Sequence, residues 1–162
     1  MNSLLRAGLA AIAFDIYWTL VVLFRERGIT LWLGLALVVC FMLPAGARRH
    51  ALIIALVGCG LDTFHVLAGR ITFQGNGLVP LWMVALWVMF SCVWSVLARS
   101  RSVPLLLLVL LAATGGPLAY LLGAYLGAMT IHVPVWQALA WLSTGWACLA
   151  LLSCGLLHRG RA

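Results

Sequence analysis

The chain alternates between long apolar stretches and short clusters that hold arginine, glycine or proline. A transmembrane helix needs about 20 mostly apolar residues, with a range of about 17 to 25. Six stretches come near that length, so the pattern predicts an all-α fold, a polytopic membrane bundle of about six transmembrane helices. We expect these helices at 7–24, 29–46, 51–69, 78–98, 103–129 and 133–157.

Composition supports a membrane location for the whole chain. Hydrophobic residues make up 65% of the 162 residues and charged residues only 8%, whereas about 25% of the residues in soluble domains are charged. A soluble fold of this size could not bury so much apolar surface. The sequence therefore predicts a single transmembrane domain over residues 1–162, with membrane lipids as its surroundings.

The net charge of +7 could suggest nucleic-acid binding, because clustered basic residues are the usual footprint of phosphate contacts. Here the ten basic residues are all arginine and are dispersed between apolar stretches. That distribution is typical of signals that fix membrane orientation and of contacts with anionic headgroups. We expect no nucleic-acid partner.

The arginines also predict an orientation in the bacterial inner membrane. Arginine is enriched in the cytoplasmic loops of membrane proteins. With a cytoplasmic N-terminus, that side receives seven arginines and the other side three, which favours cytoplasmic ends for the chain (N-in/C-in). The cytoplasmic set is Arg6, Arg48, Arg49, Arg99, Arg101, Arg159 and Arg161, and the opposite set is Arg25, Arg27 and Arg70.

The fifth apolar stretch contains Thr114-Gly115-Gly116-Pro117 near its middle. A proline inside a helix removes one backbone hydrogen bond and clashes with the preceding turn. We therefore expect one kinked or locally broken helix here, with Pro117 at the kink. Backbone groups freed at this depth need protein or a wet cavity as partners, so the kink should face inwards.

Two of the three acidic residues, Asp15 and Asp62, lie inside predicted spans. A carboxylate at the bilayer centre costs at least ~2.5–3.5 kcal/mol, so it normally faces the bundle interior with a partner. Gly58, Asp62, His65 and Gly69 follow at spacings that place them on one helix face, and Asp62 and His65 are close enough for an ion pair or a shared proton. The alternatives are a hydrogen-bonded packing role for each carboxyl and an interfacial position for His65.

A matching face recurs in the fifth stretch, where Gly116, Tyr120, Gly123 and Gly127 repeat the same spacing. Small residues let helices approach closely, so helix packing explains the glycines without any ligand. The sixth stretch offers Gln137, Trp141 and Thr144 on one face. We expect a ligand pocket in the periplasmic half of the bundle, with the candidate residues Asp62, His65, Tyr120, Gln137 and Trp82.

Sequence signatures of catalysis are absent: there is no GxSxG, HExxH, Walker or CxxC motif, and the four histidines are scattered. We therefore expect no catalytic residues, no metal site and no cofactor. An aspartate near a histidine could support acid–base chemistry, and it could equally bind a cation or a proton.

Several short motifs resemble the DUF2878 family, small bacterial inner-membrane proteins of unknown function. They are Gly60-Leu61-Asp62, Pro80-Leu81-Trp82, Leu86-Trp87-Val88-Met89-Phe90 and Gly115-Gly116-Pro117-Leu118-Ala119-Tyr120 with Gly123 and Gly127, together with Trp18. Asp15 stands near a position where the family pattern implies an uncharged amide. The resemblance implies the membrane architecture and, by genomic association with lipid-modifying enzymes, a lipid-linked role.

Three classes of function follow. We expect first a lipid-associated accessory or scaffold protein, with a membrane or lipid-modifying protein as a partner. The alternative is a binding or transport subunit for a small solute or ion, with the pocket described above. A membrane-embedded enzyme that uses Asp62 and His65 ranks third, because no metal set or soluble loop supports it.

Overall fold

The computed structural model describes residues 3–99 and 104–159, and two of the counted arginines, Arg101 and Arg161, lie outside these ranges. The described residues form six α-helices, one 3-10 helix and two short strands. In chain order these are α1 (Ser3–Phe24), η1 (Arg25–Gly28), α2 (Ile29–Met42), α3 (Ala45–Leu67), β1 (Ile71–Phe73), α4 (Leu81–Arg99), α5 (Leu105–Tyr125), β2 (Met129–Ile131) and α6 (Val135–Arg159).

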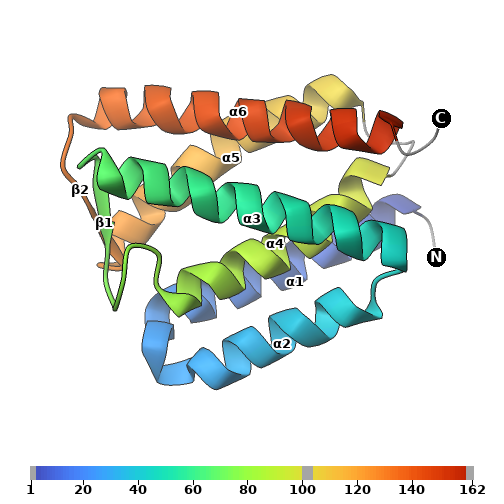
Figure 1. The fold of residues 1–162 in the computed structure, drawn as a ribbon, viewed down its shortest axis with the longest axis horizontal. Helices are drawn as coiled ribbons and strands as arrows, with labels where there is room; N and C mark the ends of the chain where they lie inside the picture. The colour runs from blue at the N-terminus through green and yellow to red at the C-terminus, as the bar shows by residue number, and fades with distance from the viewer. Residues whose placement is uncertain (1–2, 100–103, 160–162) are drawn as a thin grey trace.

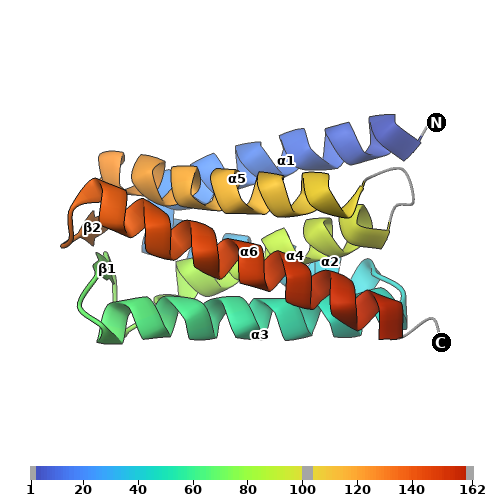
Figure 2. The same ribbon diagram turned by 90° about the horizontal axis from the view of Figure 1, so that it is seen from above.

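Successive helices run in alternating directions, so the start of α1 and the end of α6 lie at the same end of the bundle (Figures 1 and 2). Five helical stretches in the described part of the chain are long and apolar enough to cross a membrane. The first of these, Gly8–Met42, takes in α1, η1 and α2 together. The structure therefore shows an all-α bundle whose long apolar helices are compatible with a multi-pass membrane protein.

The chain reverses direction between α1 and α2. Arg25 has a φ of 49°, a left-handed conformation that non-glycine residues rarely adopt. The Tyr17 hydroxyl donates a 2.9 Å hydrogen bond to the Trp32 carbonyl oxygen, a contact that a straight helix could not make across fifteen residues. With 14 residues, α2 is about 21 Å long, shorter than the ~30 Å hydrocarbon core.

Both α3 and α5 end at a glycine in the left-handed conformation, Gly69 with φ 67° and Gly127 with φ 70°. The amide of Ala128 donates to the Gly123 carbonyl at 2.8 Å and the amide of Arg70 donates to the His65 carbonyl at 3.0 Å, which closes each helix end. Gly127 was expected on a helix-packing face and Gly69 on the face of Asp62, but both lie beyond the last residues of their helices. The left-handed backbone conformation of these two glycines ends each helix, so neither glycine contributes to a helix face.

The strands that follow these glycines pair with each other. β1 and β2 form a two-stranded antiparallel sheet in which Ile71 faces Ile131 and Phe73 faces Met129. The sheet joins the α3–α4 connection to the α5–α6 connection at one end of the bundle, visible at the left of Figure 1. It fixes the ends of α3 and α5 relative to each other.

The two halves α3–β1–α4 and α5–β2–α6 repeat one arrangement. Asp62 and Tyr120 lie 58 residues apart, and the same interval separates Gly58 from Gly116 and Gly69 from Gly127. α3 packs on α4 as α5 packs on α6.

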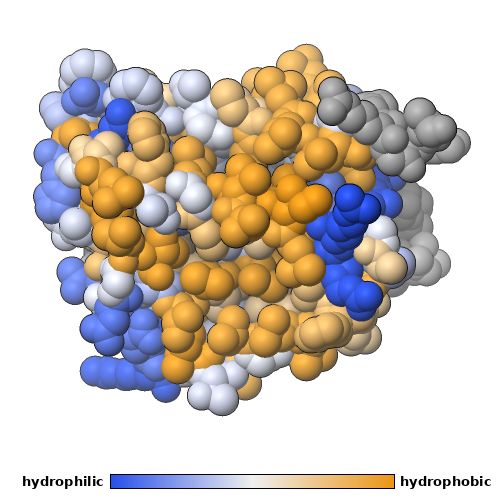
Figure 3. Space-filling view, viewed as in Figure 1, coloured by the Kyte–Doolittle hydropathy of each residue, from blue (hydrophilic) through white to orange (hydrophobic). Residues whose placement is uncertain are grey.

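α4 is the central helix, because 11 of its 19 residues are buried and it packs against α1, α2 and α3. α5 runs without a break through Pro117, which is fully buried. The helix is thus not locally broken there, and a bend at Pro117 stays a prediction. Figure 3 shows apolar side chains over the middle of the visible face, with hydrophilic groups gathered mainly towards the two ends.

Candidate functional site

Asp62 joins three helices at the centre of the molecule. Its side chain is fully buried. Trp87 of α4 donates its indole N–H to Asp62 Oδ2 at 2.6 Å, and Tyr120 of α5 donates its hydroxyl to Asp62 Oδ1. Because each carboxyl oxygen accepts a hydrogen bond from a buried donor, the pair of bonds links α3 to both α4 and α5.

Two glycines make room for two tryptophans beside Asp62. A Cβ atom at Gly58 would lie 2.2 Å from the Trp87 ring, and one at Gly116 would lie 2.2 Å from the Trp146 ring. The two indoles stack with centroids 5.1 Å apart and an interplanar angle of 21°. Gly58 and Gly116 therefore hold equivalent positions in the two repeats, each covered by a tryptophan of the following helix.

His65 is also buried, but its bond is not to Asp62. Arg70 donates from Nη1 to His65 Nδ1 at 3.4 Å, and the Arg70 guanidinium lies over the Trp141 ring, 4.0 Å from its centroid. The predicted ion pair or shared proton between Asp62 and His65 is therefore not formed. The donors Trp87 and Tyr120 occupy both oxygens of the carboxyl instead.

The remaining candidate residues do not gather around Asp62 as expected. Gln137 lies half-buried in the first turn of α6. Thr144 donates to the Ala140 carbonyl of its own helix at 2.8 Å. Trp82 is fully buried and donates its indole N–H to the Gln74 carbonyl at 2.8 Å. At Gly123, an added Cβ would meet the end of the Met129 side chain at 3.1 Å.

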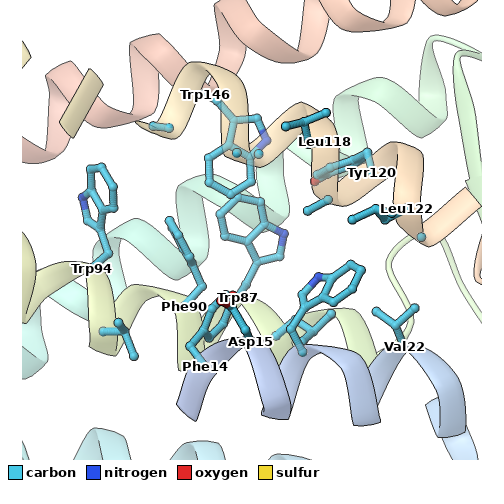
Figure 4. Close-up of a pocket in the computed structure, with 18 of the residues that line it drawn as sticks. Phe14, Asp15, Val22, Trp87, Phe90, Trp94, Leu118, Tyr120, Leu122 and Trp146 are labelled. Atoms are coloured by element: carbon cyan, nitrogen blue, oxygen red, sulfur yellow. The ribbon is translucent and has the colours of Figure 1, made fainter. Parts of the chain in front are cut away.

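A cavity of about 400 Å³ lies between α1, α4 and α5, lined in part by Trp87 and Tyr120 but not by Asp62 (Figure 4). This volume is in the range of ~300–1,000 Å³ that is typical of ligand pockets. The walls are almost entirely apolar, and Phe90 of α4 is at the centre of an aromatic cluster with Phe14, Trp87, Trp94 and Trp146. Of the expected pocket residues, only Tyr120 and Trp82 line this cavity.

The cavity reaches the surface of the bundle along α5. Leu111, Leu118 and Leu122 of α5 line it and are also exposed on the surface. These residues lie along a helix that is long and apolar enough to span a membrane. The opening therefore faces the depth at which a bilayer would present its hydrocarbon chains.

The position of the cavity follows from a difference between the two repeats. α6 packs closely on α3, where a Cβ at Gly145 would lie 3.0 Å from the Leu61 side chain. The equivalent contact would join α4 to α5, but no comparable packing occurs there within the described residues. Because Trp87 and Trp146 hold equivalent positions, Gly145 corresponds to Leu86, and Leu61 corresponds to Ala119; Leu86 and Ala119 both line the cavity.

Among the described residues that line the cavity, Asp15 of α1 has the only charged side chain. It is exposed, and no described side chain donates a hydrogen bond to its carboxyl group. The interpretation of Asp15 as a hydrogen-bonded packing residue of the bundle interior is therefore wrong. Its carboxyl group lies at the mouth of an apolar site.

Sequence reasoning missed a second buried polar network. His50 of α3 is bonded through Nδ1 to Ser95 Oγ at 2.7 Å, and its Nε2 lies 3.1 Å from the Ser153 carbonyl oxygen. Trp94 donates its indole N–H to Ser153 Oγ at 2.8 Å. This network ties α3, α4 and α6 together. The available signal was a histidine directly after Arg48 and Arg49, and two serines inside otherwise apolar stretches.

Within residues 3–99 and 104–159, no group of three or more His, Cys, Asp or Glu side chains is placed to hold a metal ion. The arrangement offers instead a buried, satisfied carboxyl at Asp62 and an apolar, side-opening cavity with one carboxyl at its mouth. What it can do chemically is hold an apolar chain.

The model of one protein family, described as "Protein of unknown function (DUF2878)", matches residues 8–152. No curated protein matches the chain, and no solved structure does.

Proposed function

Because the chain belongs to the DUF2878 family of proteins of unknown function, its geometry is the guide to its role, and we propose that it binds the hydrocarbon chain of a membrane amphiphile. The site is the cavity between α1, α4 and α5. This proposal keeps the predicted association with lipid and gives it a location.

The observation that carries the proposal is an apolar cavity that opens towards the membrane. An empty apolar cavity forfeits the dispersion contacts that its walls would otherwise make. A hydrocarbon chain restores those contacts without any polar group to satisfy. The aromatic rings of Trp87 and Phe90 line the cavity and give the chain a rigid surface to pack against.

For the bacterial inner-membrane protein that we propose, three features support six crossings with both ends in the cytoplasm. The six helices alternate in direction (Figure 1). η1 reverses the chain between α1 and α2, so the stretch Gly8–Met42 counts as two crossings, the second a short one. The arginine distribution favours cytoplasmic ends.

The geometry does not favour the solute pocket around Asp62. Both carboxyl oxygens accept bonds from Trp87 and Tyr120, and Gln137 does not line the cavity. We assign Asp62 a packing role, in which its hydrogen bonds fix α4 and α5 against α3.

Native mass spectrometry with an uncharged monoacylglycerol as the probe tests the proposal. Gly115 lines the cavity, and a Cβ there would meet no other atom within 4 Å. Gly115→Leu should therefore fill part of the cavity without a clash. Gly60→Leu is the matched control, because Gly60 is also helical and open but does not line the cavity.

We expect one monoacylglycerol to stay bound to the wild-type protein and to Gly60→Leu, and to be lost from Gly115→Leu. Equal retention by all three proteins would show that the bound lipid lies elsewhere, and no retention by any of them would remove the proposed function.

A further inference from the structure

The carboxyl group of Asp15 has no partner in the part of the chain that the structure describes, although it lies near the middle of the 22-residue helix α1. A carboxylate at that depth costs at least ~2.5–3.5 kcal/mol when it stays unpaired. Such residues normally pair within the protein. The exposed Asp15 side chain also lines the cavity, so a group that enters the cavity can reach the carboxylate.

The surroundings of Asp15 indicate the chemistry of that group. Phe14 precedes Asp15 in the chain, and Trp18 follows it by three residues, which is close to one helical turn. Trp87, Phe90 and Trp94 of α4 line the same cavity (Figure 4). A carboxylate beside several aromatic faces is the combination that recognises an alkylammonium group, since the ring faces and the carboxylate both attract a positive charge.

We propose that the cavity is selective for a single-chain amphiphile with a positively charged amine, which pairs with Asp15 while its chain occupies the apolar part. This inference rests on the proposed function, because it assumes that the cavity holds a hydrocarbon chain. The volume of about 400 Å³ suits one chain and a small head rather than a two-chain lipid. The depth of Asp15 in α1 also lies below the plane at which phospholipid headgroups sit.

The roles of the surrounding groups divide between charge and shape. Asp15 supplies the charge preference, and the Trp18 and Phe90 rings supply polarisable faces for the ammonium carbons. Leu86, Leu108 and Ala112 supply an apolar wall for the chain. Removal of the Asp15 charge should therefore affect amines alone, whereas filling the cavity should affect every chain.

The test uses the full chain in nanodiscs of phosphatidylcholine and two probes with a terminal bromine, 11-bromoundecyl-trimethylammonium and 11-bromoundecanol. Bromine quenches tryptophan fluorescence on contact, and five tryptophans line the cavity: Trp18, Trp82, Trp87, Trp94 and Trp146. The measured quantity is the probe concentration that gives half of the saturable quenching, compared between the two probes.

Asp15→Asn keeps the shape of the side chain and removes its charge. Glu26→Gln is the matched control, because Glu26 is an exposed acidic residue in η1 and does not line the cavity. We expect the wild-type protein and Glu26→Gln to bind the ammonium probe about tenfold more tightly than the alcohol, because the trimethylammonium group gains an ion pair with Asp15 and cation–π contacts. Asp15→Asn should lose that preference and bind the alcohol as before.

An equal preference in Asp15→Asn and the wild type, or no preference in either, would overturn the inference. If quenching by the alcohol is unaffected by Gly115→Leu, the proposed function itself is wrong. If Gly115→Leu abolishes quenching by the alcohol, but the wild-type protein binds the ammonium probe no more tightly than the alcohol, only the amine preference is wrong.

Addition of phosphatidylethanolamine to the nanodiscs tests whether the amine comes from a bilayer phospholipid or from a single-chain amphiphile. A bilayer aminophospholipid that occupied the site would compete and raise the half-quenching concentration of the ammonium probe. Our inference predicts no such change, and a tenfold rise would contradict the single-chain ligand.

Discussion

Trp87 and Trp146 stack with their ring centroids 5.1 Å apart. Trp87 lies against Gly58 of α3, and Trp146 lies against Gly116 of α5. The stack is the point at which the two repeated halves meet. On one side, Trp87 donates to the buried Asp62. On the other, both tryptophans line the cavity. The same rings therefore complete the packed core and form a wall of the proposed binding site.

Of two adjacent glycines in α5, only one should be sensitive to leucine. Gly116→Leu should lower the free energy of unfolding by about 1–3 kcal/mol, because the new side chain would overlap the Trp146 ring. Gly115→Leu should leave stability nearly unchanged, since its Cβ meets open space. Thermal unfolding in detergent measures both. Equal melting temperatures for Gly116→Leu and the wild type would mean that Trp146 does not lie on this glycine.

Asp62 variants should separate shape from hydrogen bonding. Asp62→Asn keeps one acceptor oxygen, which can face Trp87, so we expect a loss of about 1 kcal/mol from the weakened bond to Tyr120. Asp62→Leu leaves two buried donors without acceptors and should cost about 1–3 kcal/mol for each.

The measurement is again detergent unfolding, with monoacylglycerol binding as the second readout. We expect Asp62→Asn to bind the probe like the wild type. An Asp62→Asn protein that folds normally but no longer binds would restore a charge-dependent role for Asp62.

The glycine that ends α5 should be sensitive to alanine for a backbone reason. Gly127 is left-handed and nothing lies within 4 Å of its Cβ position, so Gly127→Ala should cost about 1–2 kcal/mol through conformation alone. Gly155→Ala is the control, because that glycine is helical with equally open space, and alanine there should be neutral or stabilising by ~0.5–1 kcal/mol. A neutral Gly127→Ala would show that the helix end is not held in this conformation.

Topology reporters distinguish six crossings from five. Fusions after Gly28 and after Gly75 should both report the periplasm, and a fusion after Pro44 should report the cytoplasm. If the reporter after Gly28 lies on the cytoplasmic side with that after Pro44, α1 and α2 would not form two crossings.

The helices could be predicted because a bilayer demands uninterrupted apolar stretches of a known length. The predicted stretch 103–129 extends too far, since Gly127 ends α5 and the next residues pair as β2. Strands of three residues carry too short a pattern to detect against apolar surroundings. The shared spacing of the two glycine faces was visible in the sequence, but its meaning required the contacts of Trp87 and Trp146.

The candidate site could be predicted only in part. Asp62 and Tyr120 were expected together and do bond, because both lie on the inward faces of their helices. Helical spacing placed His65 near Asp62 but could not show that Arg70 would bond it instead. The cavity arises from a contact that α4 and α5 do not make, and no residue type in the sequence signals a missing contact.

The most direct test of the account is photolabelling with a membrane amphiphile that carries a diazirine in its chain, followed by digestion at arginine. Most of α4 is buried and carries the cavity wall, so a chain can reach Leu86, Phe90 and Val93 only through the cavity. We predict labelling of these residues in the wild-type protein and in Gly60→Leu, and its loss in Gly115→Leu. Labelling confined to the exposed faces of α2 and α3, with none on these α4 residues, would contradict the proposal that the cavity holds a hydrocarbon chain.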